Sequence, residues 1–228
     1  MNTQTKPSLQ PAVTKQLSVV TIIGLFFALF LPGIFVMLAD QVNPGLLISE
    51  IFFWSVTLLV LLIVVMYERQ PLSSIGLGKL TWRGLGLGVG AGLVLFFLFP
   101  VLQQVVQLLG LPISSDKAKL LADMPAWMLF LLALRAGVME EVLYRGYPFE
   151  RLLSLTGSKA VAATVPLLVF ILTHLNWGAG HLLFVTMAGG ILTLLYLWKR
   201  NLWINIIAHF LVDFITFMLI PFLLANQA

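Results

Sequence analysis

The chain has 228 residues, of which 60% are apolar and only 10% are charged, and its mean hydropathy is +1.03. A soluble domain carries about 45–50% apolar and about 25% charged residues, so this composition excludes a water-soluble globular enzyme, a nucleic-acid-binding domain and a disordered chain. The absence of cysteine excludes disulfides, thiolate metal sites and cysteine nucleophiles. We therefore predict an all-α, polytopic bundle of transmembrane helices that binds no nucleic acid.

Apolar runs close to the roughly 20 residues that span a bilayer follow one another along the whole chain. A polar tail at 1–16 precedes them, and the first run is expected to bend near Pro32-Gly33. A short segment at 178–184 would add an eighth span to the seven that we predict. The seven cover residues 17–39, 46–66, 84–109, a run from about 126, then 159–177, 182–198 and 202–224.

Two features of the N-terminal half concern organisation rather than chemistry. Gly84, Gly88 and Gly92 lie four residues apart on one helical face, the pattern that lets membrane helices approach closely. Polar loops are expected at 67–83 and 112–125. We divide the chain into a polar cytoplasmic tail (1–16), N-terminal transmembrane helices (17–123) and a catalytic transmembrane core (124–224).

The basic residues predict an orientation, because cytoplasmic loops gather Lys and Arg. With the N-terminus inside, ten basic residues fall on the cytoplasmic side and two, Lys117 and Lys119, on the other. We therefore expect an integral protein of a bacterial cytoplasmic (inner) membrane, with its N-terminus inside and its site facing the cytoplasm. The ten are Lys6, Lys15, Arg69, Lys79, Arg83, Arg145, Arg151, Lys159, Lys199 and Arg200.

Five ionisable residues within the predicted spans are candidates for a site, because each costs at least about 2.5–3.5 kcal/mol to insert. Glu141 and Arg145 are four apart, so they share a helical face and can pair. Glu140 is offset by about 100° and has no cation at that spacing, which leaves its carboxylate free for chemistry. The other three are His174, His209 and Asp213, of which the last two are also four apart.

Chain spacing predicts that these residues converge in an intramembrane polar cavity. Glu140 lies seventeen residues before Gly157, the expected tip of a helical hairpin, and His174 lies seventeen residues after it. His209 comes eight residues after Asn201 and reaches the same plane if the hairpin tip projects roughly 12 Å further.

A glutamate and two histidines at one depth allow two hydrolytic mechanisms. Glu140, His174 and His209 could hold a zinc ion that activates water. Alternatively, Glu140 itself deprotonates the water and the histidines stabilise the tetrahedral oxyanion without any metal. Both mechanisms hydrolyse an amide or ester and neither needs a serine or cysteine nucleophile.

Three sequence motifs resemble one family. Glu140-Glu141-Val142-Leu143-Tyr144-Arg145 resembles the E-E-x-x-x-R signature of the CPBP intramembrane proteases, the CAAX protease and bacteriocin-processing family. Phe170 to His174 is similar to its F-x-x-x-H motif. His209 to Asp213 is similar to its H-x-x-x-N or H-x-x-x-D motif, with aspartate where many members have asparagine.

The resemblance implies an intramembrane endopeptidase whose partners are the bilayer and a membrane-bound peptide or a prenylated CAAX protein. It implies that Glu140 activates water, that Glu141 and Arg145 support its helix, and that His174 and His209 stabilise the oxyanion or bind metal. Asp213 would help to hold the site. One alternative is a non-catalytic bacteriocin-immunity or scaffolding protein. The other is a proton-coupled transporter, but the lack of inverted repeats in the sequence counts against a transporter.

Overall fold

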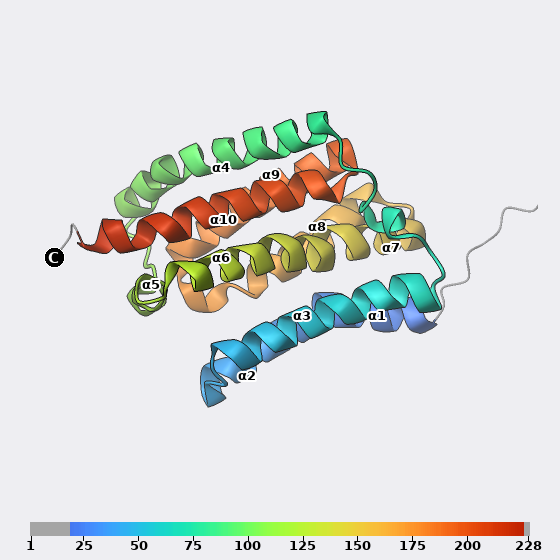
Figure 1. The fold of residues 1–228 in the computed structure, drawn as a ribbon, viewed down its shortest axis with the longest axis horizontal. Helices are drawn as coiled ribbons and strands as arrows, with labels where there is room; N and C mark the ends of the chain where they lie inside the picture. The colour runs from blue at the N-terminus through green and yellow to red at the C-terminus, as the bar shows by residue number, and fades with distance from the viewer. Residues whose placement is uncertain (1–18, 226–228) are drawn as a thin grey trace, which may run out of the picture.

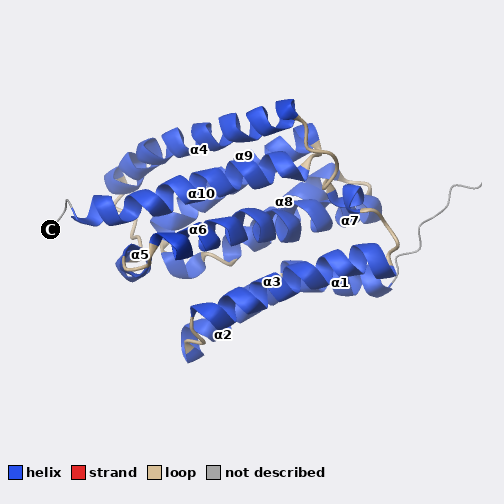
Figure 2. Cartoon of the chain, viewed as in Figure 1, coloured by secondary structure: helices blue, strands red, loops and turns tan. Residues whose placement is uncertain are grey.

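The computed structural model describes residues 19–225, and this part of the chain contains helices and no strand (Figures 1 and 2). The all-α prediction is therefore confirmed. The predicted tail at 1–16 lies outside the described residues, as do the first two residues of the first predicted span.

Ten α-helices follow one another between residues 19 and 225, the part of the chain that the structure describes. Three π turns and two 3-10 turns lie among them, and all three π turns directly follow or interrupt a longer helix. The α-helices are α1 (Val19–Leu29), α2 (Leu31–Val42), α3 (Leu46–Leu62), α4 (Trp82–Leu108), α5 (Ser115–Ala122), α6 (Ala126–Arg135), α7 (Tyr147–Thr156), α8 (Lys159–Leu172), α9 (Ala179–Lys199) and α10 (Leu202–Ala225). The π turns are η1 (Ile63–Tyr67), η3 (Ala136–Glu140) and η4 (Val142–Gly146), and the 3-10 turns are η2 (Leu72–Ile75) and η5 (Leu175–Trp177).

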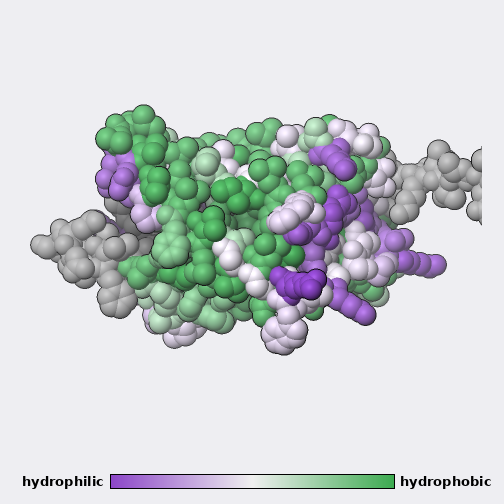
Figure 3. Space-filling view, turned by 90° about the horizontal axis from the view of Figure 1, so that it is seen from above, coloured by the Kyte–Doolittle hydropathy of each residue, from purple (hydrophilic) through white to green (hydrophobic). Residues whose placement is uncertain are grey.

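The long helices run alternately between two ends of the molecule (Figure 1). The basic end comprises the connections 68–81, 157–158 and 200–201, and the α5 end comprises the connection 43–45, α5 and residues 173–178. Hydrophilic side chains gather at the basic end, next to a broad apolar surface, in Figure 3. This distribution suits a protein that places apolar side chains in a bilayer and its charges at the surface.

Five helical segments are long and apolar enough to cross a membrane: 19–42, 46–67, 82–108, 179–199 and 202–219. The helical run from α6 through α7 carries buried charges, and α8 has 14 residues, so neither meets that description. The count of seven spans stays a prediction.

Three predictions about short segments of the chain can be compared with the structure. The first span does break before Pro32, since α1 ends at Leu29 and Pro32 lies in the first turn of α2. The 112–125 loop was wrong in part, because α5 occupies its middle. An extra span at 178–184 was wrong, because these residues begin α9; the apolar run simply starts one turn earlier than hydropathy suggests.

The glycine face of α4 packs closely against another helix, as predicted, and the structure shows that this helix is α10. A Cβ on Gly88 would lie 2.9 Å from the carbonyl oxygen of Ile204, and one on Gly92 would lie 2.9 Å from that of Ala208. The missing side chains therefore let the two backbones touch. This contact sets α10, which carries His209 and Asp213, against the outer helix.

We expect Gly88→Ala to destabilise the folded protein by about 1–3 kcal/mol, because the added methyl group meets backbone atoms that cannot move away. Gly90→Ala is the matched control on the same helix, because no atom of another described segment lies within 4 Å of its Cβ position; a helical alanine there gains about 0.5–1 kcal/mol. Thermal unfolding in detergent measures both. Equal unfolding temperatures for the two variants would contradict the packing described here.

Candidate active site

The two adjacent glutamates lie where the helical run between Ala126 and Thr156 widens into π turns. Glu140 ends η3, and Glu141 separates it from η4, which ends at Gly146. π turns inside α-helices occur frequently at functional sites. Gly137 permits this segment to touch α10, because a Cβ there would lie 2.9 Å from the backbone nitrogen of Phe210. Glu140 is thereby brought against the helix that carries His209.

Glu141 is the centre of a buried polar network. Arg145 Nη1 donates to its Oε1 at 2.9 Å, and both side chains are almost fully buried. Asn205 Nδ2 donates to its Oε2 at 3.2 Å and to the Leu192 carbonyl oxygen at 2.7 Å. The predicted Glu141–Arg145 pair is thus confirmed. A fully hydrogen-bonded carboxylate of this kind holds its neighbours in place rather than reacting.

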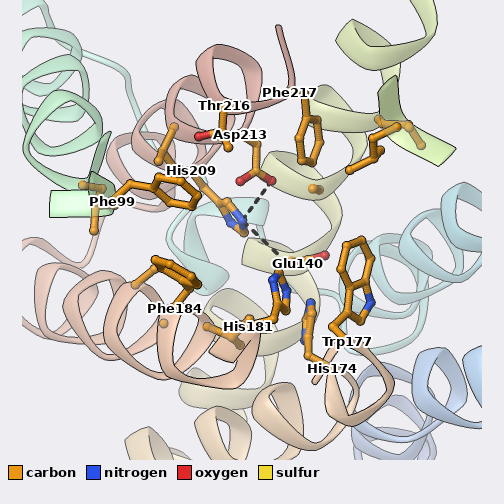
Figure 4. Close-up of a pocket in the computed structure, with 18 of the residues that line it drawn as sticks. Phe99, Glu140, His174, Trp177, His181, Phe184, His209, Asp213, Thr216 and Phe217 are labelled. Carbon is orange, nitrogen blue, oxygen red and sulfur yellow. Dashed lines mark ion pairs between the residues drawn. The ribbon is translucent and has the colours of Figure 1, made fainter. Parts of the chain in front are cut away.

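His209 connects this network to the second glutamate. Its Nδ1 lies 2.8 Å from Glu141 Oε1, which fixes the ring and directs Nε2 toward two further carboxylates. Nε2 is 3.5 Å from Asp213 Oδ2 and 3.7 Å from Glu140 Oε2. Figure 4 shows His209 between Asp213 and Glu140. The sequence predicted no cation four residues from Glu140 on its own helix, and the one contact of this kind that Glu140 makes among the described side chains, with His209, comes from another helix.

His174 faces the same cavity but from outside a helix. It follows Thr173, the residue that caps the end of α8, and therefore lies in a turn rather than on the hairpin arm that we predicted. Its Nδ1 is 2.9 Å from the Phe170 carbonyl oxygen, and its ring lies 5.8 Å from that of His181. The turn allows this side chain to point across toward Glu140 (Figure 4).

The predicted hairpin geometry explains the common depth. Gly157 ends α7 in the left-handed conformation (φ +66°) and Ser158 caps α8, so the tip lies where we expected it. Glu150 forms an ion pair with Arg200, which lies in the short connection between α9 and α10. Because Glu150 is seven residues before the tip, the tip extends roughly 10 Å beyond Arg200. This projection brings Glu140 level with His209.

A cavity of about 350 Å³ contains these groups, a volume within the range of small-molecule sites. The polar lining residues are Glu140, His174, His181, His209 and Asp213, together with Arg135 and Thr216. The walls are mostly aliphatic and aromatic, and include stacked Phe99 and Phe184, whose ring centroids are 4.6 Å apart. Glu141 and Arg145 do not line the cavity, so they support its polar groups from behind.

The residues predicted to hold zinc bring suitable donors but not a suitable arrangement. Nδ1 of both His174 and His209 is engaged, which leaves Nε2 of each for a ligand, as in zinc-binding histidines. Among the side chains that the structure describes, however, no group of three or more His, Cys, Asp or Glu is close enough to hold a metal ion. Zinc binding at Glu140, His174 and His209 stays a prediction.

Sequence reasoning missed two polar residues of the site. Asn205 is fully buried and holds Glu141, and its spacing of four from His209 on one helical face could have indicated this. His181 was not among the candidate residues, yet it lies in the first turn of α9 and lines the cavity.

The comparison with protein families gives a match over the C-terminal part of the chain. Residues 122–215 match the family described as "Rce1-like: Type II CAAX prenyl endopeptidase Rce1-like". This segment is Rce1-like. It contains all six site residues predicted from the sequence, and the match confirms the resemblance drawn from the three motifs. No curated protein and no solved structure gives a match.

The family match and the apolar helices bear on the class of protein. The Rce1-like family is a protease family, and the described helices include five that can cross a membrane. The apolar helices therefore make the chain an integral membrane protein, and its segment 122–215 is similar to a protease family.

Proposed function

We propose that the protein is an intramembrane endopeptidase in which Glu140 activates the attacking water. The observation that carries this proposal is the position of the Glu140 carboxylate, which lines an apolar cavity together with His174 and His209 and faces His209 Nε2 at 3.7 Å. A carboxylate in such a position can take a proton from water, which is general base catalysis.

The proposed reaction balances around one peptide bond. The Glu140 carboxylate accepts a proton from water while the water oxygen bonds to the scissile carbonyl carbon. The oxyanion that forms accepts a hydrogen bond from Nε2–H of His209 in its doubly protonated form, whose Nδ1–H is held by Glu141. Glu140 then returns the proton to the leaving nitrogen as the carbon–nitrogen bond breaks.

The cavity wall supports a membrane-associated substrate. Leu95, Leu98, Leu102 and other aliphatic and aromatic side chains surround the polar groups. Such a wall suits an apolar substrate, because burial of apolar surface drives binding. A peptide that carries a prenyl group near its C-terminus fits this chemistry, and we propose it as the substrate class.

The deciding experiment uses the purified protein in lipid nanodiscs. We expect it to cleave a farnesylated peptide, and products formed in H₂¹⁸O to carry the heavy oxygen in the new carboxylate. Glu140→Gln serves as the inactive control. Absence of cleavage for farnesylated and unmodified membrane peptides alike would contradict a protease and favour the non-catalytic immunity or scaffolding role.

Activity without a bound metal is a separate expectation. Because Glu140, His174 and His209 are not gathered around one point, we expect the protein to contain far less than one zinc ion per chain and to keep its activity after dialysis against a chelator. Elemental analysis of the same sample provides the control. One ion per chain, with activity lost on chelation and restored by zinc, would overturn the glutamate mechanism in favour of the metal site.

We also propose that the basic end lies in the cytoplasm of a bacterial cell, as the positive-inside rule indicates. The cavity is bordered at the α5 end by Leu46, Leu121 and Trp177, and by no residue of the connections at the basic end. These lining residues do not support the predicted opening toward the cytoplasm.

The orientation can be tested by labelling a single cysteine. Because the chain has no cysteine, Ser158→Cys at the hairpin tip should react with a membrane-impermeant maleimide only after cells are permeabilised. Labelling of intact cells would reverse the orientation.

A further inference from the structure

A second cavity reaches Glu140 from the side of the N-terminal helices. It has a volume of about 240 Å³ and lies between α2 and α3 on one side and the site-bearing segments on the other. Helix α2 contributes Phe35 and Asp40, and α3 contributes Ser49 and Phe53. None of these four residues lines the first cavity.

The two cavities meet at the catalytic carboxylate. Their shared lining residues are Arg135, Glu140, His174 and Trp177. A peptide whose scissile bond lies at Glu140 therefore has room on both sides of that bond, one flank in each cavity. The first cavity has the larger apolar wall and suits the prenylated flank, so the second is left for the flank that departs.

Arg135 is the only arginine or lysine among the described residues that line the second cavity. Its Nε donates to Glu50 Oε1 at 2.7 Å, and its guanidinium lies 4.7 Å from the centre of the Phe53 ring. These contacts hold one edge and one face of the group. An arginine carries five N–H donors, and the two terminal amino groups of Arg135 make no hydrogen bond to another described residue.

The remaining charges of the cavity restrict where an anion could bind. Asp40 lies exposed at the rim, where it accepts a hydrogen bond from Asn176 Nδ2, and Glu140 lies at the inner end. Both would repel a carboxylate. Arg135 is the one place in this cavity where a carboxylate meets donors of opposite charge, in the planar geometry that suits bidentate binding.

We propose that the second cavity binds the C-terminal, departing end of the substrate and that Arg135 binds its free carboxylate. This inference rests on the proposed protease function. Arg135 is five residues from Glu140 along one helical run, about 7.5 Å. An extended peptide advances about 3.3–3.6 Å per residue, so a carboxylate at Arg135 places a bond two to three residues upstream at Glu140.

The test measures occupancy of the second cavity without requiring turnover. Ser49→Cys introduces the only thiol of the chain into this cavity, and Ser55→Cys introduces one on an exposed position of the same helix as the matched control. The probe is N-acetyl-trileucine, used as the free acid and as the C-terminal amide. The rate of maleimide labelling is followed by mass spectrometry.

We expect the acid to slow the labelling of Ser49→Cys by about tenfold at about ten times its Kd, because labelling follows the unoccupied fraction. The amide should have no effect, and Ser55→Cys should label at the same rate throughout. Arg135→Gln combined with Glu50→Gln, which keeps the charge balanced, should abolish the protection, and Arg135→Lys should retain part of it. Equal protection by acid and amide, or protection that survives the double variant, would overturn the inference.

Failure of the proposed protease function can be distinguished from failure of the Arg135 inference, because the two give different results. If the acid protects Ser49→Cys through Arg135 but no farnesylated peptide is cleaved, the cavity binds carboxylates and the protease proposal is wrong. If peptides are cleaved but substrates that end in a free acid and in an amide have equal kcat/KM, Arg135 does not bind the C-terminal carboxylate and the inference is wrong.

Discussion

Glu140→Gln should lower kcat/KM by about 10²–10⁴, the usual contribution of a general base, while the protein keeps its fold. The amide has the shape of the carboxylate but cannot take a proton from water. The side chain is 13% exposed and has no buried ion pair to lose, apart from its 3.7 Å approach to His209. Turnover of the farnesylated peptide and thermal unfolding are measured on the same preparation.

Glu150→Gln is the control for this variant, because Glu150 lies on the same helical run at the basic end and lines neither cavity. It should keep near-normal turnover. A Glu140→Gln protein that cleaves at the wild-type rate would exclude Glu140 as the base, and the same loss in both variants would indicate general damage to the helix.

Glu141→Gln should instead act mainly on stability, and the expected loss is about 3–5 kcal/mol because a buried charge is left without its partner. Arg145 is 2% exposed, and its Nε and Nη2 have no hydrogen-bond partner among the residues that the structure describes. Denaturant unfolding in detergent measures the loss. His209 also loses the carboxylate that holds Nδ1, so activity should fall as well.

Adding Arg145→Met to Glu141→Gln tests the cause of that loss. If the unpaired guanidinium is responsible, the double variant should be more stable than Glu141→Gln alone, since the buried charge is gone. Glu150→Gln, which breaks the more exposed pair with Arg200, should cost only about 0–1 kcal/mol. A double variant less stable than either single one would show that Arg145 contributes mainly through packing on Phe170, 4.3 Å from its guanidinium carbon.

Local patterns in the sequence were sufficient for much of the fold and for the Glu141–Arg145 pair. Helical periodicity fixes which residues share a face, and the Gly157 tip with its capping serine is a local signal. The same periodicity explains why the glycine face of α4 was predicted correctly. These features depend on residues within a turn or two of one another, so hydropathy and spacing report them directly.

Contacts between helices that are distant in the sequence could not be predicted from hydropathy and residue spacing. Glu140 approaches His209 because Gly137 lets two helices touch, and Asn205 reaches Glu141 across the same contact. The position of His174 beyond the end of α8 follows from where that helix stops, which residue spacing alone did not reveal. The second cavity depends on how α2 and α3 lie against the core. Each of these facts belongs to the packing of several helices.

The π turns at η3 and η4 have a consequence for how this segment tolerates insertions and deletions. A π turn has the length of an α-turn with one residue added, so removal of a single residue such as Val138 would restore a regular helix. The residues of the turn itself, Glu140 among them, would then shift by one position, which is about 100° around the helix axis, and Glu140 would turn away from His209. Such a deletion improves the helix and removes the site, which makes the length of this segment as much a requirement for function as the identity of its glutamates.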